Sequence, residues 1–162
     1  MSQSSSEAEI IGVTTKLLGA VGCGDYDTYS RLSDASLTCV EPETQGNIIE
    51  GLAFHKYFFD LGRATFLPER PPPKLNTVSS PHVRMLGPDH ALIVYIRVIQ
   101  QGDKISTAEE TRIWKRDGVS KEWKNVHFHV RDPPLPAILS RMPLTTLTAF
   151  DSRSRAQRSS RL

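Results

Sequence analysis

The second half of the chain carries three runs in which apolar and polar residues alternate. Residues 91–100 are rich in β-branched and aromatic side chains, residues 107–116 alternate more mildly, and residues 123–130 alternate again. A period of two places successive side chains on opposite faces of a strand. Two short turns, at 102–103 and 117–118, contain glycine and aspartate and separate the runs. The pattern predicts an antiparallel meander with an apolar face that another element must cover.

The N-terminal part of the chain follows helical spacing instead. Ser4-x-x-Glu7 has the form of a capping box. The residues that follow it at the spacing of one helix face, up to a stop at Gly22, are Ile10, Ile11, Thr14, Leu17, Leu18 and Val21. A second, short helix is predicted over residues 26–32, with Asp25 as its cap.

A strand, a third helix and a further strand are predicted before the meander. The first strand covers residues 36–40, and the helix begins near Asn47 or Glu50 and extends to residue 62. Its dense aromatic residues indicate packing against a large surface, such as the concave side of the meander. Residues 74–86 form a strand with a bend at Ser80-Pro81. This order predicts an α+β roll, with N-terminal helices packed on a curved antiparallel β-sheet and a cavity between them.

Two arginines fall inside the predicted meander. Arg97 lies in the middle of its most hydrophobic run, and Arg112 lies two positions before Trp114. Because a buried arginine is costly unless it is paired, two of them in neighbouring strands indicate a shared acidic partner or an anion site. Alternation places Glu110 on the Arg112 face. Either Glu110 or Glu50 neutralises an arginine, or the arginines present their donors to a bound carboxylate.

Composition places the chain among ordinary globular proteins of one domain. Hydrophobic residues make up 38% of the sequence and charged residues 23%. No apolar run approaches the roughly 20 residues that a membrane span requires, so we expect no membrane partner. Cys23 and Cys39 lack metal-ligand spacing, and we interpret them as reduced thiols of a cytoplasmic protein. We expect no cofactor.

The C-terminal residues 133–162 are basic, although the rest of the chain is not. They hold five arginines against one aspartate, whereas residues 1–132 hold 15 Lys and Arg against 17 Asp and Glu. A basic tail binds nucleic acid or an acidic membrane in some proteins, but a solvated terminus is the commoner case. Within the tail, residues 137–150 are mildly apolar and predict a short helix or strand.

Three histidines are the candidate metal ligands. His127 and His129 share one face of the last alternating run, and His55 lies in the third predicted helix. Imidazoles are common zinc ligands when they converge. No spacing in the chain is diagnostic of a ligand set, so we interpret these histidines as structural and predict no metal site.

Several segments of the sequence together resemble one known family, the association (hub) domain of calcium/calmodulin-dependent protein kinase II. The resemblance covers roughly residues 7–131 and preserves the order and spacing of its segments. The most specific of these are EGLAFHKYFF (50–59), YIRVIQ (95–100), EETRIWKRDG (109–118) and EWKNVHFHV (122–130). The N-terminal segments EIIGVTTKLLGAVGCGDYDTYSRL (9–32) and TCVEPETQGNIIEG (38–51) continue the match.

The resemblance implies a fold, an assembly and a domain organisation. The fold is the nuclear-transport-factor-2-like cone, and identical domains assemble through dimers into two stacked rings of twelve or more subunits. We therefore expect an N-terminal tail at 1–6, a hub domain at 7–132 and a C-terminal tail at 133–162. The sequence has no Gly-rich nucleotide loop or kinase catalytic-loop triplet, so we expect a hub on its own or a hub-only fragment. The expected partners are further copies of the chain and hub-bearing kinase subunits.

The resemblance also implies a pocket for a small carboxylate. Arg97 and Arg112 match the family's pocket arginines, and the complete set of pocket residues we predict is Arg97, Arg112, His55, Tyr95, Glu110 and Arg131. The third arginine of the family directly follows the His-Phe-His triplet, where this chain has Val130, and Arg131 comes one position later. A shift of one residue along a strand moves a side chain to the other face unless a bulge restores it.

Two other classes of function are weighed against a non-catalytic scaffold. An isomerase, cyclase or dehydratase of the same fold needs a carboxylate or histidine inside the cone to act as base, and Glu110, His127 and His129 are the residues to check. A nucleic-acid-binding protein would use the arginine-rich tail, which has no lysine and only Phe150 for base stacking. We predict the scaffold, with no catalytic residues.

Overall fold

The computed structural model describes residues 3–63 and 72–131. The elements, in chain order, are α1 (Gln3–Cys23), α2 (Tyr26–Leu32), β1 (Ser33–Val40), the 3-10 turn η1 (Pro42–Thr44), β2 (Ile49–Glu50), α3 (Ala53–Arg63), β3 (Leu75–Met85), β4 (His90–Gln101), β5 (Lys104–Arg116) and β6 (Trp123–Arg131). The predicted helix or strand at 137–150 lies outside the described residues. No helix in the described part of the chain is long and apolar enough to span a membrane.

The strands form one curved sheet in the order β2-β1-β6-β5-β4-β3. Strands β4 to β6 make the predicted antiparallel meander, the separately predicted β3 pairs antiparallel with its β4 edge, and β1 joins its β6 edge in parallel orientation. That parallel pair was not predicted, because no local pattern reports which distant strand a short strand will join. The predicted bend at Ser80-Pro81 is confirmed, since the pairing of β3 with β4 shifts between Ser79 and His82.

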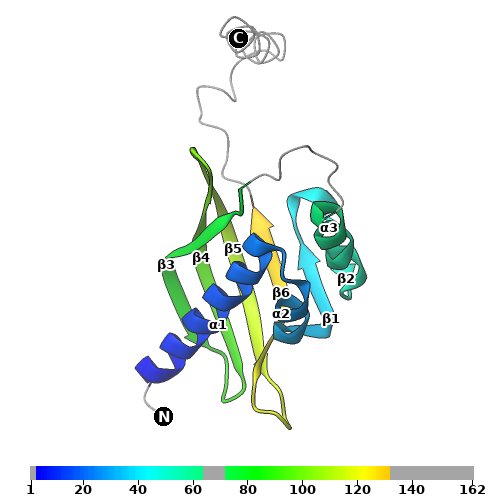
Figure 1. The fold of residues 1–162 in the computed structure, drawn as a ribbon. Coiled ribbons are helices and arrows are strands. Elements are labelled where there is room, and N and C mark those ends of the chain that lie inside the picture. The colour runs from blue at the N-terminus through cyan, green and yellow to red at the C-terminus, as the bar shows by residue number, and fades with distance from the viewer. Residues whose placement is uncertain (1–2, 64–71, 132–162) are drawn as a thin grey trace, which may run out of the picture. The chain divides into compact units, whose positions relative to one another are not determined.

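Helix α1 covers the concave side of the sheet (Figure 1). The predicted apolar face is the face that the helix buries, with Ile10, Thr14, Leu17 and Leu18 fully excluded from solvent. The polar Thr14 is accommodated there because its hydroxyl donates to the carbonyl of Ile10 at 2.8 Å. The core that this face joins includes residues of β4, β5 and β6, among them Ile93, Tyr95, Trp114 and Phe128. Burial of this stripe is the main source of stability for the helix.

Helix α3 uses its aromatic residues differently from the prediction. Its buried side packs on α2, where Phe59 lies 5.1 Å from Tyr29 between ring centroids. Tyr57, Phe58 and Leu61 are exposed instead of resting on the concave side of the meander. The predicted packing of these aromatic residues against a large surface such as the concave side of the meander is therefore wrong for Tyr57 and Phe58, because α1 covers that side.

The C-terminal end of α1 lies directly against the start of β3. The backbone N–H of Lys74 donates to the carbonyl of Gly22 at 3.1 Å, and the Asn76 amide donates to the carbonyl of Leu18 at 2.9 Å. A Cβ atom at Gly22 would lie 2.1 Å from the Lys74 carbonyl oxygen, whereas a Cβ at Gly19 meets nothing within 4 Å. Glycine at position 22 is what permits this close approach.

We expect Gly22→Ala and Gly19→Ala to change stability in opposite directions. Gly22→Ala forces helix and strand apart and lowers the free energy of unfolding by about 1–3 kcal/mol, the usual cost of overpacking. Gly19 lies on the exposed side of the same helix. Gly19→Ala should therefore raise the free energy of unfolding by about 0.5–1 kcal/mol, because alanine has the higher helix propensity. Urea unfolding at one fixed protein concentration measures both values. Equal effects of the two substitutions would contradict the close approach at Gly22.

Candidate functional site

A buried network of charged and polar side chains lies where β4 and β5 run side by side. Glu110 stands opposite Tyr95 in the register of the two strands. One oxygen of Glu110 lies 2.8 Å from Nη1 of Arg97, and the other lies 2.8 Å from Nη2 of Arg112. The Tyr95 hydroxyl donates to Glu110 and accepts from Nε of Arg112 at 2.8 Å. The network therefore joins four of the six predicted pocket residues in one cluster.

Local charge keeps Glu110 ionised inside the protein. Burial by itself raises the pKa of Glu110, but the guanidinium groups of Arg112 and Arg97 outweigh it, so the pKa of this carboxyl lies below its ordinary value. Burial raises the pKa of Tyr95, which keeps its hydroxyl neutral and able to donate. One carboxylate faces two guanidinium groups, so the cluster retains one uncompensated positive charge.

Two of the arginine nitrogens that could donate hydrogen bonds have no acceptor among the described residues. Nε of Arg97 and Nη1 of Arg112 are buried and lack a hydrogen-bond partner among the described residues. The guanidinium of Arg112 also lies over the ring of Phe128, 4.6 Å from its centroid. Buried donors without partners are unusual in native proteins, because each costs about 1–3 kcal/mol. Together with the net positive charge, they make the cluster suited to an anion.

Arg131, the remaining predicted pocket arginine, lies outside the cluster. Its side chain is 63% exposed, with Nη1 3.9 Å from Oε2 of Glu109. Val130 stands opposite Glu110 in the register and is buried. The irregularity between β5 and β6 falls at Ile113/Trp114 and leaves the pairing continuous from His127 to Arg131, so no bulge turns Arg131 inward. The inclusion of Arg131 among the pocket residues is therefore corrected.

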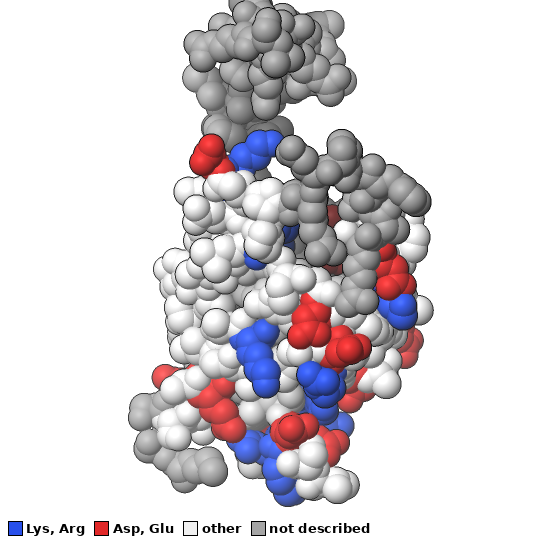
Figure 2. Space-filling model, in the orientation of Figure 1, with Lys and Arg blue, Asp and Glu red and all other residues white. Residues whose placement is uncertain are grey.

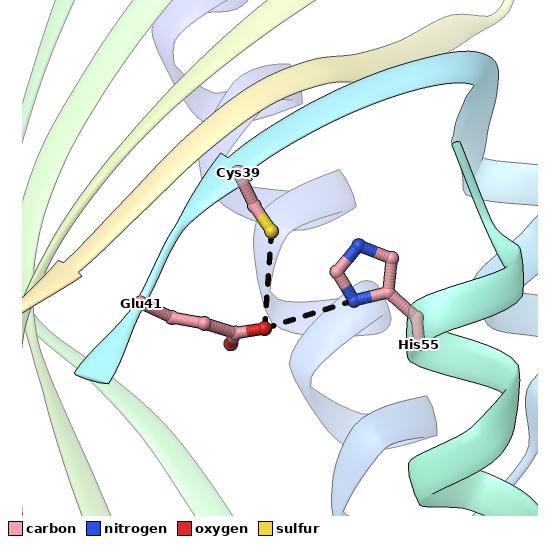
Figure 3. Close-up of side chains that lie close together, drawn as sticks. All are labelled: Cys39, Glu41 and His55. Carbon is pink, nitrogen blue, oxygen red and sulfur yellow. Dashed lines mark hydrogen bonds and ion pairs between the residues drawn. The ribbon is translucent and has the colours of Figure 1, made fainter. Parts of the chain in front are cut away.

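His55, the sixth predicted pocket residue, belongs to a second cluster. It lies in the first turn of α3 and is buried against Tyr29 and Phe128, at centroid distances of 5.7 and 5.5 Å. Its Nδ1 is 3.9 Å from Oε1 of Glu41, and the thiol of Cys39 lies 3.8 Å from that same oxygen. Figure 3 shows the three side chains pointing toward one another from β1, its C-terminal end and α3.

The ionisation of this second cluster follows from its burial. Burial, and then the positive charge of Arg112, lower the pKa of His55 to about 4, so the imidazole is neutral at pH 7. Burial and the Glu41 carboxylate raise the pKa of Cys39 to about 12, so the thiol is protonated. Burial also raises the pKa of Glu41 above its ordinary value. Cys39 and Glu41 were missed by the sequence reasoning, although an i, i+2 spacing on a strand puts them on one face.

The three histidines do not converge. His127 binds the hydroxyl of Thr38 through Nδ1 at 2.8 Å, and His129 is exposed. Both alternate with the buried Phe128, which contacts His55, so they lie on the other face of β6 from His55. The histidine trio that we weighed as metal ligands therefore does not form a site.

The fold and the buried cluster indicate the fold class to which the chain belongs. A curved sheet wrapped around a long helix is the arrangement of the nuclear-transport-factor-2-like cone (Figure 1), and here its core includes a buried charged cluster. A solved NTF2-like protein of unknown function from Pseudomonas putida has a TM-score of 0.66 to this chain at 16% identity, with 84% of this chain and 92% of that chain covered. That likeness shows the fold alone.

The family follows from closer matches. The family model of the calcium/calmodulin-dependent protein kinase II association domain matches residues 6–134 of the sequence. The rabbit kinase type II subunit delta (Oryctolagus cuniculus) is 40% identical over 132 residues, which are 78% of this chain and 24% of the rabbit protein. The solved hub homology domain of Chlamydomonas reinhardtii is 40% identical, with a TM-score of 0.73 and coverage of 82% of this chain and 99% of that one. The chain belongs to the calcium/calmodulin-dependent protein kinase II association domain family, and it spans about a quarter of the length of the kinase relatives.

We expect Glu110→Gln to destabilise the protein far more than Glu109→Gln. The first change leaves the fully buried guanidinium of Arg112 without its counter-charge, and breaking a buried pair in this way costs about 3–5 kcal/mol. Glu109 is its matched control, because it lies on the opposite face, is 49% exposed and makes only a 3.9 Å ion pair, worth about 0–1 kcal/mol. Urea unfolding at pH 7 and fixed concentration measures the difference.

The pH dependence of stability distinguishes the charge of Glu110 from its packing when the parent and Glu110→Gln are compared. Because the folded-state pKa of Glu110 is depressed, its stabilisation is complete above the unfolded pKa and is lost as pH falls through the folded value. The difference in the free energy of unfolding between the parent and Glu110→Gln should therefore become smaller below about pH 4.3. If this difference stays constant until the protein unfolds in acid, then Glu110 stabilises the fold through packing and not through its charge.

Proposed function

We propose that this chain is a non-catalytic oligomerisation scaffold that assembles through dimers into stacked rings of twelve or more subunits. The observation that carries the proposal is membership of the association domain family, with the match extending through the whole described fold. Further copies of the chain are its first partners, and kinase subunits that bear the same domain are its second. A cytoplasmic location stays a prediction.

Exposed apolar side chains support an assembly role. Tyr57 and Leu61 on α3 are 60% and 49% exposed, and Phe58 beside them is also exposed. Leu75 and Val94, on β3 and β4, are exposed as well. On the face drawn in Figure 2, most charged side chains gather in the lower half, and the upper left, over β3, holds few. Aromatic and aliphatic residues of this kind are enriched in the cores of protein interfaces.

The charged cluster inside the cone supports a non-catalytic role, because it leaves no suitable base among the candidates that we named. Glu110 points into the cone, but two guanidinium groups and a tyrosine hydroxyl stabilise its carboxylate and make it a poor proton acceptor. His127 and His129 lie on the other face of the sheet. A cone enzyme would therefore lack the bases that we named as its candidates. The arginine-rich tail of the nucleic-acid alternative lies outside the described residues.

We expect native mass spectrometry at micromolar concentration to show a multimer of the 18.1 kDa chain. The double substitution Tyr57→Asp, Leu61→Asp puts two charges on the exposed face of α3 and should shift the mass to smaller species, because desolvating an unpaired charge opposes association. Val119→Asp is the matched control, because this residue is 94% exposed in the β5–β6 turn and should leave the mass unchanged.

A parent protein that is monomeric under these conditions would overturn the scaffold proposal. A multimeric parent whose mass is insensitive to the α3 substitutions would keep the scaffold and remove α3 from its interface. Circular dichroism of each variant shows that the change in mass does not reflect unfolding.

We propose in addition that the arginine cluster binds a small carboxylate. Support comes from the unpartnered donors of Arg97 and Arg112 and from the single uncompensated positive charge. Arginine presents a planar set of donors that matches a carboxylate. Val130 weakens this site relative to the family pattern, because the position opposite Glu110 carries an apolar side chain.

We expect Val130→Arg to raise the affinity for succinate by at least about tenfold, because one more charged hydrogen bond contributes about 1.5–3 kcal/mol. Val119→Arg adds the same charge in the exposed β5–β6 turn and is the control. Isothermal titration calorimetry at one ionic strength compares the two variants with the parent. Equal gains in both variants would indicate a nonspecific charge effect and contradict a pocket at the cluster.

A further inference from the structure

Cys39, Glu41 and His55 combine three kinds of metal-binding atom in one buried place. A thiol sulfur, a carboxylate oxygen and an imidazole nitrogen from these residues all lie within 4.8 Å of one another. Thiolate, imidazole and carboxylate are the ligand types that proteins use for Zn²⁺. The combination is selective, because it includes a soft sulfur donor that Mg²⁺ and Ca²⁺ do not favour.

The distances are close to those of a coordinated ion. Ligand atoms arranged tetrahedrally at about 2.0–2.3 Å from zinc lie about 3.3–3.6 Å apart. The sulfur–oxygen separation between Cys39 and Glu41 is 3.8 Å, and the oxygen–nitrogen separation between Glu41 and His55 is 3.9 Å. Adjustments of a few tenths of an ångström bring these two separations to coordination distance, and the third, between sulfur and nitrogen, lies within 4.8 Å before any side chain moves.

Within the part of the chain that the structure describes, the ring nitrogens of His55 lack the hydrogen bonds that a buried imidazole normally makes. Nε2 of His55 has no hydrogen-bond partner among the described residues, although the side chain is only 6% exposed. Nδ1 faces Oε1 of Glu41 at 3.9 Å, beyond hydrogen-bond length, and is the nitrogen that would bind the metal (Figure 3). A purely structural histidine in such a place normally has both ring nitrogens satisfied.

The supporting elements hold the three residues in place. Cys39 is paired in the sheet with Ile49 on one side and Phe128 on the other. Glu41 follows β1 directly and its carbonyl accepts from the N–H of Thr44 at 2.9 Å, which fixes the turn. His55 is clamped between Tyr29 and Phe128. Sites on such rigid elements keep their geometry when a ligand binds.

Glu41 is the member of the cluster that a surface pocket reaches, and the charge of the cluster fits a divalent cation. A pocket of about 270 Å³ reaches Glu41, and its lining includes Gln45 and His129. The thiolate and the carboxylate together neutralise two positive charges once the thiol has lost its proton. Arg112 lies nearby, and its positive charge is only partly offset because it shares the Glu110 carboxylate with Arg97.

We propose that Cys39, Glu41 and His55 form a Zn²⁺ site that ties β1 to α3, a role beyond the proposed scaffold function. Binding displaces the thiol proton to solvent, and sulfur, oxygen and nitrogen each donate an electron pair to the metal. Three protein ligands leave one position of a tetrahedral ion for water or for an exogenous ligand. The metal links a strand of the sheet to the helix whose other face is exposed.

Cobalt titration of the full chain tests the proposal. After removal of metal with a chelator, Co²⁺ should produce a near-ultraviolet thiolate-to-cobalt absorption band that saturates at one ion per chain and disappears on addition of Zn²⁺. Cys39→Ser should abolish the band. Cys23→Ser is the matched control, because the exposed Cys23 at the end of α1 is the only other cysteine of the chain, and it should leave the band intact.

The outcomes separate cleanly. A parent protein without the band, or a band that persists in Cys39→Ser and is lost in Cys23→Ser, overturns the site. If Cys39→Ser does not fold, the partly exposed Glu41 decides, because Glu41→Gln should weaken Co²⁺ binding by at least about tenfold, and an unchanged affinity overturns the proposal. The assembly mass of the same samples reports on the scaffold function independently.

Discussion

The neutralisation of two arginines by Glu110 is the constraint on which the interior of this cone depends. Arg112 is fully buried and Arg97 mostly so, and both reach the same carboxylate from neighbouring strands. The Coulomb attraction offsets a desolvation cost of several kcal/mol per ion only because the geometry is close and a tyrosine hydroxyl completes the network. β4 and β5 must therefore keep their register, since a slip of one residue would separate the partners.

This charged interior shapes what the rest of the molecule does. The concave side of the sheet is filled by α1 and by the cluster, which leaves α3 to pack its inner side on α2 and to expose Tyr57, Phe58 and Leu61. A charged cluster inside an apolar core and exposed aromatic side chains on α3 are both unusual in a monomer. They are consistent with a domain whose outer surface is completed by other subunits.

Two clusters lie side by side in the structure and share aromatic neighbours. The ring of Phe128 lies under the guanidinium of Arg112 and against the imidazole of His55. The positive charge of Arg112 is one of the two causes that lower the pKa of His55. The arginine cluster suits an anion, and the cysteine–glutamate–histidine cluster suits a cation. Neighbouring sites of opposite preference influence each other through the low dielectric of the interior.

The sequence alone determined the elements and the faces of their side chains. Alternation placed Glu110 with Arg112 and turned Arg131 away from Val130, because the two-residue period of a strand is a local property. Only the tertiary structure decided which faces meet: that β1 joins β6 in parallel, that α3 stays exposed, and that Cys39 and Glu41 meet His55. Periodicity reports the direction of a side chain but not its partner, because the partner depends on the path of the connecting chain.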